Sequence, residues 1–293
     1  MRDISFGQYY PKKSFVHALD ARAKLLLALA YIVFVFFIRT FIGYAFAAVC
    51  LGIAIAFSRV PPKLIFKSLR AILFLIVFTL ALNALFAGTQ TANSPLLDLL
   101  GWDNSRPLAA WWIFKIYAGG LVYSVQMAVR LMLLILGPSL LTLTTSPMEL
   151  TGAIEGLLKP LSWIRFPVHE LAMIMSIALS IIPSIMEETS KIINAQKARC
   201  ADFESGNIFK KARALIPVLV PLFVSSFRRA DELAMAMDSR CYRGGKGRTN
   251  MKVPRFSWRD AVAALAFAIF GLVILVMRYQ WFAAGFFGAR WFI

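Results

Sequence analysis

The stretch FIGYAFAAVCLGIAIAF, Phe41 to Phe57, decides the fold, because its 17 residues include no charged side chain. A helix needs about 20 apolar residues, with a range of about 17 to 25, to cross the hydrocarbon core of a bilayer. Further apolar runs cover 25–38, 71–86, 119–143 and 261–277. We therefore predict an all-α integral membrane protein with about five transmembrane helices.

Composition and charge agree with a membrane location. The chain has 293 residues, is 59% hydrophobic and has a net charge of +17, and its mean hydropathy is +0.69. Seventeen Lys and Arg residues lie between Lys159 and Arg259, and most others precede residue 25 or fall within 59–70. Cations gather on the cytoplasmic side of membrane proteins and favour anionic lipid. We therefore expect a multi-pass protein of the cell membrane with a cytoplasmic N-terminus, in contact with the lipid bilayer and with no nucleic-acid partner.

The predicted organisation has four parts. Residues 1–24 are a cytoplasmic N-terminal segment, and residues 25–143 form four transmembrane helices. Residues 144–259 are a long cytoplasmic insertion, and residues 260–293 form a last transmembrane helix with an aromatic tail.

Within the insertion, Ser146-Pro147-Met148-Glu149 is typical of a helix start. Two long helical patterns follow, over 167–199 and 208–240, and proline is expected to bend them at Pro183, Pro217 and Pro221. Whether 171–182 and 214–227 enter the bilayer stays open, since each is shorter than a comfortable span.

Two similar stretches end these long patterns: Ala195-Gln196-Lys197-Ala198-Arg199-Cys200 and Ala236-Met237-Asp238-Ser239-Arg240-Cys241. A guanidinium at each tip offers a forked cation for a carboxylate or for carbonyls of another protein. A single such arginine is more often an ordinary cation at a helix C-terminus, but the duplication favours docking. The predicted docking residues are Ala198, Arg199, Cys200, Ser239, Arg240 and Cys241, and the small residues Ala195, Ala234 and Ala236 are expected to permit close helix crossing.

Other chemistry-bearing residues do not form a convincing site. Adjacent residues on a helix point about 100° apart, so Glu187-Glu188 is interpreted as a solvated face. His17 and His169 are isolated, and Gly244 to Thr249 lacks the spacing of a phosphate-binding loop. We expect no catalytic site, metal or cofactor. A stand-alone secondary transporter and a membrane-bound enzyme remain the alternatives, although paired intramembrane charges are not visible.

Several motifs together resemble the transmembrane T component of energy-coupling factor (ECF) transporters. The resemblance covers nearly the whole length and rests on motifs at Gly7–Tyr9, His17–Leu25, Thr144–Leu150, Leu158–Leu161, Ile181–Phe203 and Phe227–Gly245.

The resemblance implies a non-catalytic scaffold that joins two ATP-binding-cassette (ABC) ATPases to a small membrane substrate-binding subunit. Residues 144–259 would then be a coupling domain of long crossing helices, with Arg199 and Arg240 each engaging one ATPase, and the cargo would be a vitamin or another micronutrient. The chain departs from the family's usual Ala-Arg-Gly, with Cys at 200 and 241 and Ser at 239. Because a Cβ disfavours positive φ, we expect the left-handed caps further on, for example at Gly206 and Gly244.

Overall fold

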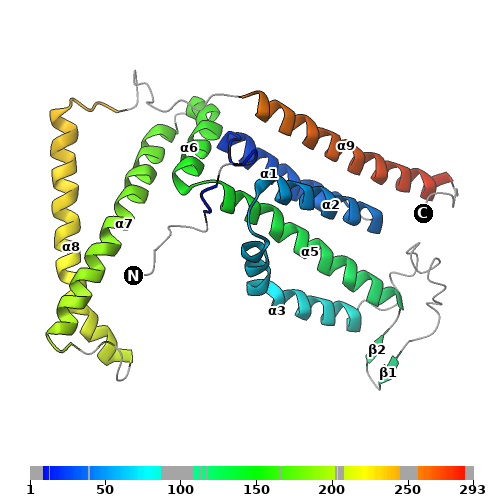
Figure 1. The fold of residues 1–293 in the computed structure, drawn as a ribbon, viewed down its shortest axis with the longest axis horizontal. Helices are drawn as coiled ribbons and strands as arrows, with labels where there is room; N and C mark the ends of the chain where they lie inside the picture. The colour runs from blue at the N-terminus through cyan, green and yellow to red at the C-terminus, as the bar shows by residue number, and fades with distance from the viewer. Residues whose placement is uncertain are drawn as a thin grey trace. The chain divides into compact units, whose positions relative to one another are not determined.

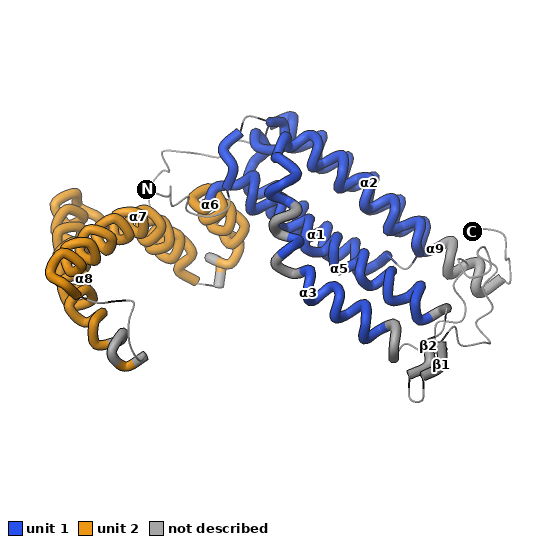
Figure 2. Tube along the Cα trace, turned by 60° about the horizontal axis from the view of Figure 1, so that its bottom comes forward, with its two compact units in different colours: residues 1–146, 254–293 blue, residues 147–253 orange. Residues whose placement is uncertain are grey.

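The computed structural model describes residues 9–12, 14–38, 40–86, 109–111, 114–116, 118–164, 166–201, 203, 208–244 and 257–287. The chain divides into two compact units, one of residues 1–146 with 254–293 and one of residues 147–253 (Figure 2). The predicted all-α membrane fold is confirmed, with one small addition. Three-residue strands β1 (Ala109–Trp111) and β2 (Phe114–Ile116) pair antiparallel in the described chain.

The described part of the first unit contains five long helices, which are drawn in Figure 1. In chain order they are α1 (Ala21–Phe37), α2 (Phe41–Ser58), α3 (Pro62–Phe86), α5 (Ala118–Thr144) and α9 (Trp258–Phe287). Helix α5 packs against α1, α2 and α3, and α1 also packs against α9. Helix α5 is therefore the central contact of the bundle.

Four helices of the described chain are long and apolar enough to cross a membrane, over Phe41–Ser58, Gly120–Thr144, Val168–Ala198 and Trp258–Tyr279. Three of them coincide with spans predicted from the sequence. Helix α1 has 17 residues, and α3 contributes a shorter apolar segment, Leu73–Asn83. The fourth candidate is α7. Its helix continues through Pro183, so the apolar segment 171–182 is part of a helix long enough to cross a membrane.

Aromatic rings fill the centre of the first unit. Phe270 of α9 lies 6.3 Å from Tyr31 and 5.8 Å from Phe46, measured between ring centroids. The Tyr31 hydroxyl donates to the carbonyl of Leu133 at 3.3 Å, as a buried tyrosine usually finds an acceptor. Gly137 of α5 lies against the Tyr31 ring so closely that a Cβ there would clash with it. The absence of a side chain at 137 thus lets α5 approach α1.

The carboxylate of Asp260 joins the first turns of α1 and α9. This residue is 1% exposed. Its Oδ1 accepts the backbone N–H of Asp20 and its Oδ2 that of Ser257, each at 2.8 Å. Asp20 in turn caps α1 by accepting the N–H of Arg22 at 3.1 Å. Since the first N–H groups of a helix lack intrahelical acceptors, one buried carboxylate fastens two helix starts together.

Two cations satisfy helix C-termini in the same bundle. The ammonium of Lys24, which is buried, donates to the carbonyls of His17 and Thr144, each at 3.1 Å. At the other end of α1, Arg130 donates to the carbonyls of Phe36 and Ile38, at 3.2 and 3.1 Å. A charge in a membrane helix is costly unless it is paired. Lys24 pairs with the carbonyl that ends α5 and with one in the turn before α1, and Arg130 pairs with carbonyls at the end of α1.

The second unit contains α6 (Pro147–Leu158), the 3-10 helix η2 (Lys159–Ile164), α7 (Val168–Ala198) and α8 (Ile208–Ser239). Helix α6 begins at Pro147, as its sequence predicts, and packs against α7. Pro183 lies inside α7, and Pro217 and Pro221 lie inside α8. The ribbon of α8 changes direction in its N-terminal half (Figure 1), which contains both of its prolines.

We predict that Asp260→Asn lowers stability by about 1–3 kcal/mol, because an amide has one acceptor for two buried N–H donors. Thermal unfolding of the purified protein in detergent measures the change. Asp238→Asn, at an exposed position of α8, is the matched control and should leave the midpoint nearly unchanged. Equal midpoints for the two variants would contradict the assigned role of Asp260.

Candidate docking site

Helix α7 ends in a Schellman motif centred on the first predicted tip. Arg199 is the C-cap, and Cys200 follows it in the left-handed region at φ 63°. The N–H of Cys200 donates to the carbonyl of Lys197 at 3.0 Å, and the N–H of Ala201 donates to that of Gln196 at 3.0 Å. These are the two hydrogen bonds that define the motif, and they satisfy carbonyls that a helix end leaves unpaired.

Helix α8 ends in the same way. Cys241 is left-handed at φ 52°. Its N–H donates to the carbonyl of Asp238 at 2.9 Å, and the N–H of Tyr242 donates to that of Met237 at 3.1 Å. The Ser239 hydroxyl also donates to the carbonyl of Ala236, at 3.0 Å. The sequence repeat therefore encodes a repeat of backbone geometry, with an arginine immediately before the left-handed residue in both helices.

The position of these caps corrects the sequence prediction. The prediction places the left-handed residue at Gly206 and Gly244, and it is wrong because Cys200 and Cys241 themselves end the helices. Gly206 lies outside the described residues, and Gly244 has its own positive φ of 85° beyond the cap. A left-handed L-residue costs roughly 1–2 kcal/mol, whereas two backbone hydrogen bonds contribute about 0.5–1.5 kcal/mol each. The hydrogen bonds of the motif thus offset the cost of the Cβ.

Both guanidinium groups lie at the surface. Arg199 and Arg240 are exposed, and so are Ala198 and Ser239. The thiols of Cys200 and Cys241 are free and exposed. In the part of the chain that the structure describes, neither arginine has an ion-pair partner. Each tip therefore presents a fork of unpaired N–H donors, which is the geometry that binds carboxylates and carbonyl groups.

The alanines predicted to permit helix crossing are exposed. Ala195 lies in the last turn of α7, and Ala234 and Ala236 lie in the last turns of α8. Hydrogen bonds between α7 and α8 are made by other residues. The small side chains therefore leave these surfaces open, and their role in close helix crossing stays a prediction.

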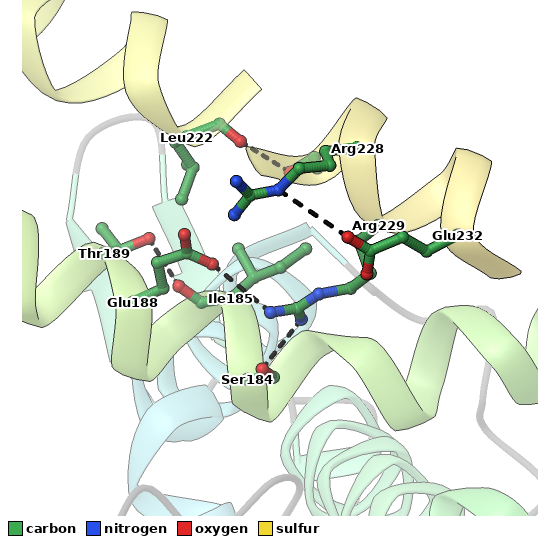
Figure 3. A network of polar contacts seen from close by, with 9 residues as sticks. Ser184, Ile185, Glu188, Thr189, Leu222, Arg228, Arg229 and Glu232 are labelled. Atoms are coloured by element: carbon green, nitrogen blue, oxygen red, sulfur yellow. Dashed lines mark hydrogen bonds and ion pairs between the residues drawn. The ribbon is translucent and has the colours of Figure 1, made fainter. Parts of the chain in front are cut away.

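Arg229 links α8 to α7, which the sequence analysis did not anticipate (Figure 3). Its Nη1 donates to the hydroxyl of Ser184 at 2.8 Å, and its Nη2 lies 3.5 Å from Oε2 of Glu188. The side chains of Arg229 and Glu188 are 35% and 29% exposed. The solvated-face interpretation therefore fits Glu187, which is exposed, but is wrong for Glu188. The only sequence signal was opposite charge on two long helices.

A second link exists because of proline. In a helix the carbonyl of Pro217 would accept the N–H of residue 221, but Pro221 has none. The side-chain amide of Gln196, on α7, reaches this carbonyl at 3.5 Å. The prolines of α8 thus free a backbone acceptor that helps to join the two helices. Gln196 lies three residues before Arg199, so the link sits within one turn of the first tip.

We predict that Cys200→Gly and Cys241→Gly stabilise the two helix ends by about 0.5–1 kcal/mol, since Gly adopts positive φ without a Cβ clash. Hydrogen exchange at the N–H groups of Ala201 and Tyr242, which close the motifs, should become slower. Ala198→Gly is the control, because a helical Gly costs about 1 kcal/mol and should speed exchange. Unchanged or faster exchange in the Cys variants would refute the prediction.

Comparison with known proteins gives consistent matches over nearly the whole chain. The family model CbiQ, described as a cobalt transport protein, matches residues 12–252. The chain is 50% identical over 281 residues to the energy-coupling factor transporter transmembrane protein EcfT of Clostridium kluyveri, which covers 96% of this chain and 99% of the relative. The EcfT of Ruminiclostridium cellulolyticum is 44% identical over 283 residues, covering 96% and 100%. The EcfT of Bacillus subtilis is 38% identical over 278 residues, covering 95% and 99%.

The aligned residues include both helix tips and nearly all of the helical bundle. The chain therefore belongs to the family of energy-coupling factor transporter transmembrane proteins.

Proposed function

We propose that this chain is the membrane scaffold of an ECF-type ABC importer. In this proposal two cytoplasmic ABC ATPases hydrolyse ATP, and a separate small membrane subunit binds a vitamin or another micronutrient. The scaffold couples the two and is itself not catalytic. The observation that carries the proposal is the pair of identical helix ends, each with an exposed arginine that has no ion-pair partner among the described residues.

Two equivalent tips suit two equivalent partners. Each Schellman motif fixes the backbone of its C-cap arginine, so the guanidinium leaves the helix end at a defined point. Charge asymmetry supports a cytoplasmic location for both tips, since 17 cations lie between Lys159 and Arg259. We infer that Arg199 and Arg240 each enter an acidic or carbonyl-lined groove of one ATPase, with the N-terminus of the scaffold on the same side.

The hydrogen bonds of the polar side chains inside the bundle favour a scaffold function rather than that of a stand-alone secondary transporter. Such transporters use intramembrane charges to bind ions or substrate. Here Arg130 donates to the carbonyls that end α1, and Asn83 donates to the carbonyl of Thr79 within its own helix, at 2.9 Å. Both side chains donate to backbone carbonyls within the fold, which supports a structural role for each of them.

Motion of one tip would reach the other helix through the links between α7 and α8. Arg229 joins α8 to Ser184 and Glu188, and Gln196 joins α7 to the carbonyl of Pro217. We infer that these links keep the two helices moving as a pair when the ATPases change their separation. A helix pair held at two points transmits rotation, whereas a pair held at one point can pivot.

We predict that Arg199→Glu with Arg240→Glu abolishes co-purification of the ATPases and coupled uptake. Hydrogen bonds to a charged group contribute about 1.5–3 kcal/mol, so losing one site should weaken binding roughly 10- to 100-fold. Either single reversal should leave one ATPase site and give a partial defect. Pull-down of the ATPases and uptake by vesicles measure both effects.

The matched control for this experiment reverses two other exposed cations of the same unit, Lys191→Glu with Arg213→Glu. It changes the net charge equally and should retain the ATPases. Normal assembly and uptake in the double tip variant would refute the proposed docks. Equal loss in tip variant and control would indicate a non-specific effect of charge, which also refutes them.

We predict that Arg229→Gln leaves ATPase binding intact but lowers the number of cargo molecules taken up per ATP hydrolysed. The change removes the contact to Glu188 and shortens the reach to Ser184. The contact is partly exposed, so the effect on stability should be below about 1 kcal/mol. Arg213→Gln is the control. An unchanged ratio of uptake to hydrolysis in Arg229→Gln would show that this link does not transmit motion.

A further inference from the structure

A basic pocket of about 860 Å³ opens in the first unit, within the roughly 300–1,000 Å³ typical of small-molecule sites. Three separate parts of the chain line it: the segment before α1, the end of α2 and the first turn of α9. The lining residues are Lys12, Ser14, Phe15, His17, Ala18, Ala56, Phe57, Arg59 and Arg259. No carboxylate is among them, so the walls carry charge of one sign.

The three cations of the pocket have no neutralising carboxylate in the described part of the chain. Lys12, Arg59 and Arg259 are exposed, and none of them has an ion-pair partner among the residues that the structure describes. Like charges that share a concave surface repel one another and raise the local concentration of anions. An anion held between them would relieve this repulsion and bring together charges from three segments.

Two of these arginines occupy locally unfavourable positions, Arg59 through its backbone and Arg259 through its charge. Arg59 ends α2 in the left-handed region, at φ 54°, with its N–H donating to the carbonyl of Ala56 at 3.2 Å. This region is unfavourable for a residue that carries a Cβ. Arg259 lies in the first turn of α9, where the positive end of the helix dipole disfavours a cation. A bound anion would compensate the positive charge of Arg259 at the start of α9.

Hydrogen bonds hold one wall of the pocket in place. Ring atom Nε2 of His17 lies 3.0 Å from the carbonyl of Tyr10, and Nδ1 lies 2.7 Å from the hydroxyl of Ser14. A carbonyl only accepts, so Nε2 carries a proton, and in the neutral ring Nδ1 accepts from Ser14. The loop that carries Lys12 is therefore tied to residues on both sides of it.

Exposed phenyl rings stand beside the cations. Phe57 is 62% exposed and Phe15 is 41% exposed. Phe57 lies in the last turn of α2, which is one of the helices long and apolar enough to cross a membrane. The pocket therefore sits at the end of a candidate span, where headgroups meet the hydrocarbon core, and it combines positive charge with apolar surface.

We propose that this pocket binds the phosphate group of an anionic phospholipid. Arg59, Arg259 and Lys12 contact the phosphate and headgroup, while Phe57 and Phe15 contact the first methylene groups of the acyl chains. A free phosphate ion would use the same cations but would gain nothing from the rings. The position at the end of α2 thus favours the lipid as the source of the phosphate.

The test measures lipid bound to the delipidated full-length protein in a neutral detergent. Native mass spectrometry follows binding of short-chain phosphatidylglycerol, with phosphatidylcholine and inorganic phosphate as separate probes. Phosphatidylglycerol should bind more tightly than phosphatidylcholine, and inorganic phosphate should not displace it. At about 1 kcal/mol for each basic residue near the surface, Arg59→Gln with Arg259→Gln should weaken phosphatidylglycerol binding roughly 30-fold.

The matched control is Lys63→Gln with Arg70→Gln, which removes two exposed cations of α3 that do not line the pocket. It should keep phosphatidylglycerol binding within about twofold of the unmodified protein, given the charge screening of surface groups. Lys12→Gln, outside the helices, tests the site without altering a helix end and should weaken binding as well.

Thermal unfolding provides a second readout. Phosphatidylglycerol should raise the unfolding midpoint of the unmodified protein and of the α3 control, but not that of the arginine variant. Equal weakening in the pocket and control variants would overturn the proposal in favour of general surface attraction. Displacement by inorganic phosphate at similar concentration would assign the site to a soluble phosphate and overturn the lipid as its ligand.

Discussion

The ends of helices lack intrahelical partners for four N–H and four C=O groups, and this constraint organises most of the polar structure of the chain. Asp260 accepts two N–H groups that start α1 and α9. Lys24 donates to the carbonyl of Thr144, the last residue of α5, and Arg130 donates to the carbonyl of Ile38, which caps α1. In a membrane an unsatisfied backbone group costs several kcal/mol, so these few side chains fix which helix ends can lie together.

The same constraint distinguishes two pairs of cations. Lys24 and Arg130 satisfy carbonyls of the bundle. At the tips of α7 and α8 the backbone satisfies its own carbonyls through the Schellman motifs, so the guanidinium groups there have no such task. A cation that the fold does not use is available to a partner, provided that the helix end is closed without it. Because the backbone turns at Cys200 and Cys241 satisfy the last carbonyls of their helices, the guanidinium groups of Arg199 and Arg240 can bind other groups.

The sequence predicted the parts of this arrangement that depend on local pattern. The length of the apolar runs predicted the spans over 41–57, 119–143 and 261–277. The repeated sequence at 195–200 and 236–241 predicted the ends of two helices. The left-handed conformation of Cys200 was not predicted, because residue propensity considers only the steric cost of a Cβ at positive φ. In the structure, two backbone hydrogen bonds of the Schellman motif offset that cost. The pair of Arg229 and Glu188 joins residues 41 positions apart, and no periodic signal links them. Tertiary pairs of this kind follow from how helices cross, which composition does not encode.

The described part of the second unit has a small apolar core. Among its described residues, the buried apolar side chains are Ala153, Val168, Ala172 and Val218. Large apolar side chains of α8, such as Phe223 and Phe227, are instead 61% and 69% exposed. Exposed apolar surface of this kind marks an interaction with lipid or with protein, and anything bound there would stabilise the unit by mass action. Two helices joined by Arg229 and Gln196 and packed on few buried side chains separate at low cost.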